Sequence, residues 1–202
     1  GYCPVNIIPN GVSEEEFVPV ELAEGAADFL FVGELRQLKG VDIFLTALSL
    51  LKDQFPAASA VIVGDGPDSQ RFIKMSETLG LSKQVVFPGR LPARQAFTLG
   101  RAMVVPSRAE SFPYIVLEAG AAQKPLISTD VGGINEIVEG SDTQLIEPAN
   151  PLALKNAMAE FLSDPARQAL KAQRLQALIL KRFNIETMAA QVTDFYLSVL
   201  KR

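Results

Sequence analysis

Residues 29–63 read FLFVGELRQLKGVDIFLTALSLLKDQFPAASAVIV, and this stretch determines the fold class. It begins and ends with short apolar runs, Phe29–Val32 and Ala60–Val63, which show little polar alternation. Such runs are typical of parallel strands that helices cover on both faces. Between them, apolar residues recur at helical spacing along one stripe, formed by Val41, Phe44, Leu45, Leu48 and Leu51. A strand, a helix and a strand in this order predict a βαβ unit.

The same alternation continues along the chain. Further strands are predicted at Val85–Phe87, Ala102–Val105, Leu126–Ser128 and Gln144–Ile146, and further helices at Asp68–Leu79, Ala93–Leu99, Tyr114–Ala122 and Gly133–Val138. After Pro148 the strands stop. Asn150-Pro151 and Asp164-Pro165 each pair an N-cap residue with a proline suited to the first helical turn, and a last helix is expected from about Glu186.

These patterns predict an α/β protein with a single domain over residues 1–202. We expect a doubly wound, mainly parallel six-stranded Rossmann-like sheet with helices on both faces and an all-helical C-terminal tail. The N-terminal residues Gly1–Pro4 include neither an initiator Met nor a leader sequence, so we expect the chain to begin inside a longer protein.

The composition excludes several classes of function. A net charge of −4 with scattered Lys and Arg argues against a nucleic-acid partner, and no apolar stretch approaches the length of a membrane span. Cys3 is the single cysteine and there is no histidine. An intrachain disulfide, a cysteine-based metal cluster and a serine-histidine triad are therefore excluded, and a reducing cytoplasm is the expected location.

Ligands of an open parallel sheet bind beyond the carboxyl ends of its strands, so the strand-to-helix junctions are the places to search for a site. Four junctions carry unusual residues: Gly33–Gly40, Gly64–Pro67, Pro106–Pro113 and Thr129–Gly133. The second has Ser69 where a dinucleotide fingerprint has its third glycine, so it is a weak signal. No phosphate-loop lysine follows a glycine-rich loop, which excludes an ATP-hydrolysing P-loop.

The third junction is the most informative. Pro113 is suited to open a helix and to leave the N–H groups of Tyr114 and Ile115 free for an anion such as a diphosphate, although a plain capped helix has the same pattern. Glu118 lies in an otherwise apolar helix and therefore needs a partner. That partner is a basic side chain, backbone N–H groups, or a ligand diol such as ribose hydroxyls.

Charged residues at the same end of the sheet add to this site. Glu110 precedes Glu118 by eight residues, so the two carboxylates are suited to different parts of one extended ligand. Arg36 and Lys39 follow the first strand and are either solvated or neutralise phosphate charge.

Taken together, these segments resemble the C-terminal domain of the retaining GT-B glycosyltransferases of family 4, which include sucrose synthases and many lipopolysaccharide and mannosyl transferases. The resemblance covers essentially the whole chain, and the pair of glutamates spaced E-x7-E is its most specific element. The segments that carry it are Asn10-Gly11-Val12 with Phe17, Phe31-Val32-Gly33 with Lys39-Gly40, Val63–Pro67, Phe87-Pro88-Gly89, Pro106-Ser107, Glu110-Ser111-Phe112 to Glu118-Ala119, Pro125-Leu126-Ile127, and Thr129 with Gly132-Gly133.

The resemblance implies a nucleotide-sugar substrate such as a UDP or GDP sugar, and a role in polysaccharide or lipopolysaccharide synthesis. Glu110 would contact the donor hexose, Glu118 the ribose, and Lys39 the departing diphosphate, so that Glu110 and Lys39 are the catalytic pair. Backbone N–H groups of residues 112–114 would meet sugar and phosphate, and the base would lie near Arg90 and Leu91. The expected binding set is Gly33, Glu34, Arg36, Lys39, Arg90, Leu91, Glu110, Ser111, Phe112, Pro113, Tyr114 and Glu118.

The resemblance also implies that no metal or other cofactor is needed. It implies an N-terminal acceptor domain as a partner, absent from this chain, and leaves peripheral membrane association of the full-length protein open. Three positions depart from the family pattern: Glu34 replaces a common phosphate-binding Arg, Pro113 a common Gly, and Thr143 another Gly. Two alternatives remain: a non-catalytic binding module in which Glu34 marks a lost phosphate site, and a GT-B sugar-nucleotide epimerase or another doubly wound enzyme.

Overall fold

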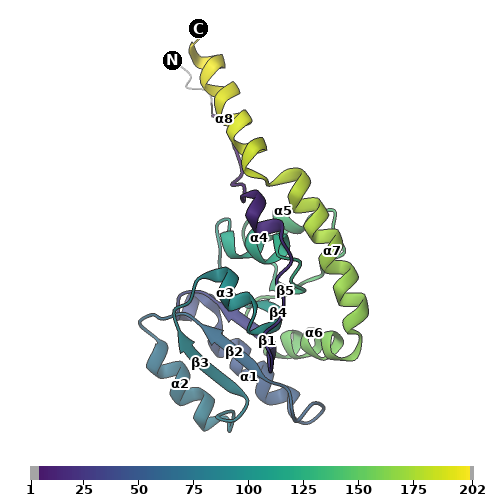
Figure 1. Ribbon diagram of the computed structural model, residues 1–202. Helices are drawn as coiled ribbons and strands as arrows, with labels where there is room; N and C mark the ends of the chain where they lie inside the picture. The colour runs from purple at the N-terminus through teal and green to yellow at the C-terminus, as the bar shows by residue number, and fades with distance from the viewer. Residues whose placement is uncertain (1–4, 201–202) are drawn as a thin grey trace.

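A computed structural model of the protein describes residues 5–200 (Figure 1). Cys3 and the expected internal cut at Gly1–Pro4 lie outside the described residues. The six predicted strands form one sheet in which each neighbouring pair is parallel, in the order β3-β2-β1-β4-β5-β6. The strands are β1 (Ala27–Val32), β2 (Ala60–Val63), β3 (Val85–Gly89), β4 (Gly100–Val105), β5 (Leu126–Thr129) and β6 (Leu145–Ile146).

This topology confirms the predicted doubly wound α/β fold. From β1 the chain adds strands toward β3 and then returns to add β4, β5 and β6 on the other side of β1. The direction of winding therefore changes between β1 and β4. At such a switch point the two loops at the carboxyl ends of the strands lead to opposite faces of the sheet, and a crevice opens between them.

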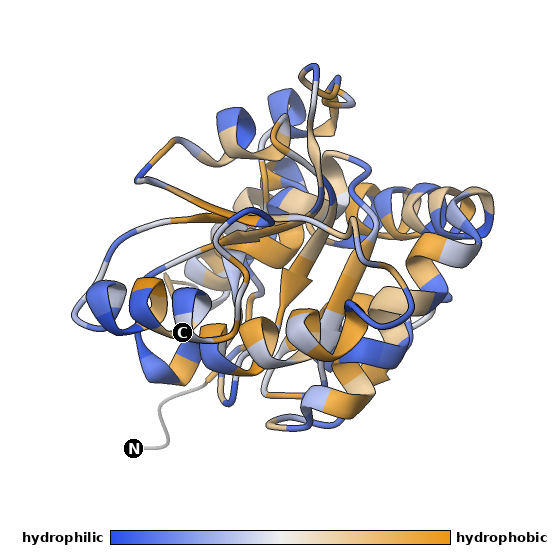
Figure 2. Ribbon diagram, turned by 90° about the horizontal axis from the view of Figure 1, so that it is seen from below, coloured by the Kyte–Doolittle hydropathy of each residue, from blue (hydrophilic) through white to orange (hydrophobic). Residues whose placement is uncertain are grey.

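Helices cover both faces of the sheet, as predicted. One apolar cluster joins the sheet to α1 (Val41–Leu51), α2 (Ser69–Thr78) and α6 (Pro151–Ser163). A second cluster joins it to α3 (Ala93–Phe97), α4 (Tyr114–Ala121), α5 (Ile134–Val138) and α7 (Pro165–Arg182). Figure 2 shows the apolar strands in the middle of these helices.

The central strand β1 explains why both faces are apolar. Its side chains alternate, so that Phe29 and Phe31 pack in the first cluster while Leu30 packs in the second. Phe29 and Leu30 are fully buried. A strand buried on both faces needs apolar residues at every position, which is the continuous pattern seen in the sequence.

The C-terminal part is all-helical, as predicted, and its helices begin at the predicted caps. Asn150 Oδ1 accepts a hydrogen bond from the N–H of Ala153 at 2.9 Å, and Asp164 Oδ1 accepts one from the N–H of Arg167 at 3.0 Å. The last helix, α8 (Ile185–Leu200), extends away from the sheet (Figure 1) and has no buried residue. Along this helix Met188, Val192 and Phe195 are partly exposed, and Tyr196 is 65% exposed.

Some details differ from the predictions. Two short 3-10 helices, η1 (Glu14–Phe17) and η2 (Gln37–Lys39), were not expected, because three or four residues are too few to show a helical period. Pro113 is the N-cap of α4 rather than its first helical residue. Among residues 5–200, no helix is both long enough and apolar enough to span a bilayer.

Candidate functional site

A cleft of about 520 Å³ opens at the carboxyl ends of β1 and β4, where the winding direction changes. Its walls are the loop after β1, the loop after β4 and the first turns of α4. Most of the predicted binding residues line it, namely Gly33, Glu34, Lys39, Leu91, Glu110, Pro113, Tyr114 and Glu118. The structure thus brings these residues, which lie in separate segments of the sequence, to one cleft.

A smaller hollow of about 340 Å³ adjoins the cleft beyond β2. Arg90 and Asp65 line its far side. The two cavities share Val32, Gly33, Glu34 and Leu91, so together they form one elongated depression across the carboxyl end of the sheet. An extended ligand fits such a shape better than a compact one.

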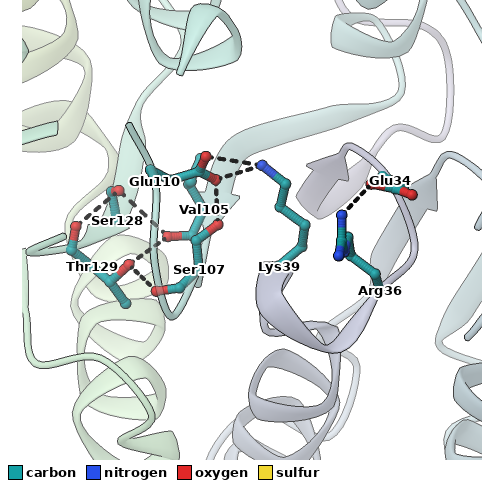
Figure 3. Close-up of polar contacts among 8 residues, drawn as sticks. All are labelled: Glu34, Arg36, Lys39, Val105, Ser107, Glu110, Ser128 and Thr129. Carbon is teal, nitrogen blue, oxygen red and sulfur yellow. Dashed lines mark hydrogen bonds and ion pairs between the residues drawn. The ribbon is translucent and has the colours of Figure 1, made fainter. Parts of the chain in front are cut away.

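Lys39 and Glu110 form the strongest polar contact in the cleft (Figure 3). Lys39 Nζ donates to both carboxylate oxygens of Glu110, at 2.8 and 2.9 Å, and the Glu110 side chain is only 9% exposed. Ser107 Oγ also donates to Glu110 Oε1 at 2.7 Å. The ammonium and the hydroxyl thus fix the position of a largely buried carboxylate at the cleft wall.

The turn that carries Lys39 is held against the loop after β4. Gly40 adopts a left-handed φ of 73°, and a Cβ at this position would lie 1.9 Å from the carbonyl oxygen of Pro106, so only glycine permits this approach. Because the two loops touch here, Lys39 and Glu110 meet although 71 residues separate them.

Arg108 links the loop after β4 to the segment between β1 and α1 by hydrogen bonds. Its Nη1 donates to the Gln37 carbonyl at 2.6 Å, and its two terminal nitrogens donate to the two carboxylate oxygens of Asp42 at 2.8 and 2.6 Å. Burial tends to raise the pKa of the Asp42 carboxyl, but the hydrogen bonds and charge of Arg108 outweigh it and lower the pKa. This bidentate pair orients the turn before α1.

The loop after β5 donates hydrogen bonds to the backbone of the loop that carries Glu110. Thr129 Oγ1 donates to the carbonyl of Ser107 at 2.7 Å, and the N–H of Gly133 donates to the carbonyl of Ser111 at 2.6 Å. Gly132 has a φ of 52°, and a Cβ there would lie 1.8 Å from the carbonyl oxygen of Glu110. The double glycine that the sequence placed at this junction therefore allows close contact between two loops.

Glu118 projects from α4 into the cleft and differs from Glu110 in its surroundings. The residue is half-buried and lines the cleft. Among residues 5–200, its carboxylate has neither a hydrogen bond nor an ion pair. Burial, with a smaller contribution from the charge of Glu16, raises the pKa of Glu118. Of the three partners considered from the sequence, residues 5–200 supply neither a basic side chain nor backbone N–H groups.

The first turn of α4 adds free backbone donors near Glu118. Pro113 is its N-cap and has no N–H to donate, while the Pro113 carbonyl accepts from the N–H of Val116 at 3.1 Å. Within the described residues, the N–H groups of Tyr114 and Ile115 have no acceptor. They lie at the positive end of the helix dipole, where an anionic ligand group is stabilised.

Glu34 brings a further carboxylate to the junction of the two cavities. It accepts a hydrogen bond from Arg36 Nη1 at 3.3 Å, and both side chains are about half exposed (Figure 3). The ion pair turns the Arg36 guanidinium toward Glu34, and Arg36 does not line either cavity.

The structure does not bring all of the predicted residues into the depression. Ser111 and Phe112 line neither cavity, and the Phe112 ring packs against Phe183 with ring centroids 5.8 Å apart. Conversely, the supporting roles of Asp42, Arg108 and Thr129 were not predicted, because each acts on a segment distant in the chain. In the described part of the chain, no three His, Cys, Asp or Glu residues gather as a metal site requires.

Comparisons with known proteins identify relatives of this chain. A family profile described as "Glycosyl transferases group 1" matches residues 12–177. The glycogen synthase of Mycobacterium tuberculosis strain H37Rv is 28% identical over 204 residues, which cover 98% of this chain and 49% of that protein. The D-inositol 3-phosphate glycosyltransferase 1 of Catenulispora acidiphila is 31% identical over 195 residues, covering 85% of this chain and 47% of that protein. The chain thus spans about half the length of these curated relatives.

Solved structures share the fold. Sucrose-phosphate synthase from Thermosynechococcus elongatus superposes with a TM-score of 0.86 at 26% identity, covering 97% of this chain and 53% of that one. HepE from Anabaena, in complex with UDP-glucose, superposes with a TM-score of 0.84 at 23% identity, covering 96% of this chain and 57% of that one.

Proposed function

Since the chain belongs to the group 1 glycosyl transferases, we propose that its cleft binds a nucleoside diphosphate sugar. In the whole protein, the hexose of this donor is transferred to an acceptor with retention of anomeric configuration. The chain acts as the donor-binding domain, and the acceptor is bound by a domain outside it. The length match supports this division, since the curated relatives described above are about twice as long.

The unpaired carboxylate of Glu118 carries the proposal. A half-buried carboxylate without a protein partner is unfavourable, and burial raises its pKa accordingly. Two vicinal hydroxyls, such as those of a ribose, supply two donors to one carboxylate. Glu118 faces a cleft large enough for a ligand, so ligand hydroxyls complete its hydrogen bonds.

The remaining groups fit the rest of such a donor. The smaller hollow at Arg90 and Leu91 is suited to the base, and the free N–H groups of Tyr114 and Ile115 are suited to the diphosphate. Glu110, which Lys39 and Ser107 fix in place, is suited to the hexose hydroxyls. UDP-glucose, found in the HepE complex, belongs to this class of ligand.

Lys39 is suited to assist the chemical step. When the bond between the hexose and the diphosphate breaks, negative charge grows on the leaving phosphate oxygen. A fixed ammonium and helix N–H dipoles stabilise that charge without reorganisation at the moment of reaction. In the free protein Lys39 binds Glu110, so donor binding requires the ammonium to share its three donors between Glu110 and phosphate. On this proposal no metal ion is needed, and the cytoplasmic location stays a prediction.

A second candidate function is a binding module without catalysis, and Glu34 is the observation that favours it. Glu34 lines both cavities, and it pairs with Arg36, which lines neither. A carboxylate at a diphosphate site repels the ligand. If this repulsion prevents donor binding, the cleft would retain its shape but lose its ligand.

Calorimetric titration tests the proposal. UDP, GDP and ADP and their glucose conjugates are titrated into the protein, and at least one pair is expected to bind. Glu118→Ala should then weaken binding by about a hundredfold, since it removes two hydrogen bonds to a charged group. Glu77→Ala, which removes an exposed carboxylate from α2 outside both cavities, is the matched control and should bind as the unaltered protein does. No binding of any of the six compounds would favour the binding module with a lost site.

A further inference from the structure

A second cavity system lies beside the edge strand β6, between α6 and α7. One part has a volume of about 480 Å³, and an adjoining part has about 570 Å³. Both parts are lined by Thr143, Gln144 and Lys171. We refer to the two parts together as the β6 crevice. It shares no lining residue with the cleft at the carboxyl end of β1 and β4.

The β6 crevice is positively charged although the chain as a whole carries a net charge of −4. Its cations are Arg167, Lys171 and Arg174, spaced so that they lie along one side of α7. Its carboxylates are Asp142 and Glu160. Three cations against two carboxylates leave a local excess of positive charge.

Several hydrogen-bond donors of the β6 crevice converge on one acceptor. One oxygen, Glu160 Oε1, lies 3.1 Å from Gln168 Nε2, 3.4 Å from Lys171 Nζ and 3.9 Å from an Arg167 nitrogen. Within the described residues, Lys171 Nζ donates a hydrogen bond to Glu160 Oε1. The ammonium has three N–H donors, so two of them remain. The Lys171 side chain is only 15% exposed and lines both parts of the crevice, so a ligand bound there can accept from its remaining N–H donors.

The other walls suit a sugar-like body. Leu126, Leu145 and Leu175 form an apolar side, whereas Asn156 and Gln144 present amide groups that donate to and accept from hydroxyls. The volume of the first part lies in the range typical of small-molecule sites. A ligand that fits this lining has an anionic group for Lys171 and hydroxyls for the amides.

We propose that the β6 crevice is a second ligand site, which binds a phosphorylated monosaccharide with its phosphate at Lys171 and Arg174. The phosphate supplies further acceptors to Lys171 and Arg174, and it tolerates Asp142 and Glu160 because both carboxylates are already paired with cations of α7. The sugar ring packs on the apolar side and its hydroxyls bind the amides. This site is independent of the donor cleft and of its proposed function.

Glucose 6-phosphate is the probe for this proposal. We expect it to bind saturably to the ¹⁵N-labelled protein, with shifts of the amide signals of Thr143, Gln144 and Leu145. Glucose and inorganic phosphate, each titrated alone, should bind more weakly, since each makes half of the contacts. Adding UDP should not displace the probe, because the donor cleft shares no residue with the crevice.

Variants locate the phosphate. Lys171→Met keeps most of the buried stem and should weaken probe binding by about tenfold or more, as expected for one charge-assisted hydrogen bond. Arg174→Gln changes a side chain that is 67% exposed, so the fold is preserved, and a loss of several-fold is expected. Lys74→Met on the exposed side of α2 is the matched control and should leave binding unchanged.

Three results would overturn the proposal. They are the absence of saturable shifts at residues 143–145, equal binding of the probe by the unaltered protein and by both variants, and displacement of the probe by UDP. Equal affinity for inorganic phosphate would contradict the assignment of a sugar. Only the displacement result depends on whether the donor cleft binds nucleotides; the other results do not.

Discussion

Glu118 and Lys124 lie six residues apart, yet their charged groups meet opposite conditions. Lys124 follows α4, is 4% exposed, and donates from Nζ to the Phe97 carbonyl at 2.7 Å and to the Gly100 carbonyl. Glu118 is half-buried at the other end of the sheet, where within residues 5–200 no hydrogen bond or ion pair reaches its carboxylate. Burial shifts the pKa of both groups toward the neutral form, lowering that of Lys124 to about 8 and raising that of Glu118.

The comparison distinguishes a charged group that stabilises the fold, Lys124, from one that we propose binds a ligand, Glu118. Phe97 is the last residue of α3, so Lys124 satisfies carbonyls at a helix end and ties the loop before β4 to the start of β5. Glu118 has no such role and opens onto the cleft. Burial and a shifted pKa alone therefore do not indicate a functional site; the direction in which the side chain projects and its lack of partners do.

The largest effect is expected from Gly132→Ala, which alters the cleft end without touching a charge. The new Cβ would lie 1.8 Å from the Glu110 carbonyl oxygen at a φ of 52°, so the loop of Glu110 must move. We expect a loss of about 2–4 kcal/mol in the free energy of unfolding, measured with urea, together with weakened donor binding. Gly25→Ala, at a φ of 73° with nothing within 4 Å of the added Cβ, is the matched control. Equal losses in the two variants would show that backbone strain, not the loop contact, is responsible.

Lys124→Met tests the structural side of the comparison. It leaves the two carbonyls without a donor and should lower the free energy of unfolding at pH 7 by about 1–3 kcal/mol. Because the pKa of Lys124 is about 8 in the folded protein and 10.5 ordinarily, the unfolded chain binds more protons between these values. The contribution of Lys124 to stability should therefore rise with pH from 8 to 10.5.

Urea denaturation of the unaltered protein and of Lys124→Met at several pH values in this window measures that contribution. Lys74→Met serves as the control for loss of an exposed lysine. A difference that stays constant across the window, or weakened donor binding in the folded Lys124→Met variant, would contradict the assignment of Lys124 to structure alone.

Acidification should act on the ligand side of the comparison. Ribose hydroxyls bind the ionised Glu118, and the pKa of free Glu118 is raised above its ordinary 4.5. Donor affinity is therefore complete well above this raised pKa and should fall several-fold as pH decreases through it. Glu16, whose charge also acts on Glu118, is paired with Arg94 beside α4. The Glu118→Gln variant keeps Glu16 and Arg94 but removes the ionisable group at position 118. If the fall in affinity at low pH is lost in this variant, Glu118 causes it. If the variant and the unaltered protein show the same pH profile, Glu118 is excluded as the cause.

Removing metal ions is expected to have the smallest effect. On the proposed mechanism it does not change UDP affinity at all. UDP affinity measured by calorimetry should be the same in EDTA and in excess Mg²⁺, because Lys39 and the helix N–H groups take the role of a cation. A Mg²⁺-dependent affinity would show that Glu34, Glu110 or Glu118 holds a metal together with the phosphate.

The sequence predicted the fold well because strand and helix periods are local. All six strands and the helical tail were found, with shifts of a few residues at the ends of β1, β3 and β4. The family, which the motif residues predicted, is confirmed by a profile that matches residues 12–177. Glu118 was identified from the apolar residues around it, and the structure places it on the cleft wall.

The contacts between distant loops could not be predicted. The sequence suggested Lys39 for phosphate and Glu110 for sugar, but not that the two bind each other across 71 residues. Arg108 had no assigned role, because its partners Gln37 and Asp42 belong to a turn whose position depends on the glycine at position 40. The β6 crevice also escaped notice, since it forms only when α6 and α7 pack at the sheet edge.

The central claim is that the carboxylate of Glu118 binds the ribose hydroxyls of the donor. Calorimetry with UDP and with its 2′,3′-dideoxy analogue, on the unaltered protein and on Glu118→Ala, measures the coupling between the two. The account predicts that loss of the hydroxyls weakens binding by about tenfold or more in the unaltered protein and hardly at all in Glu118→Ala. Equal weakening in both proteins would show that the hydroxyls bind elsewhere and would contradict the account.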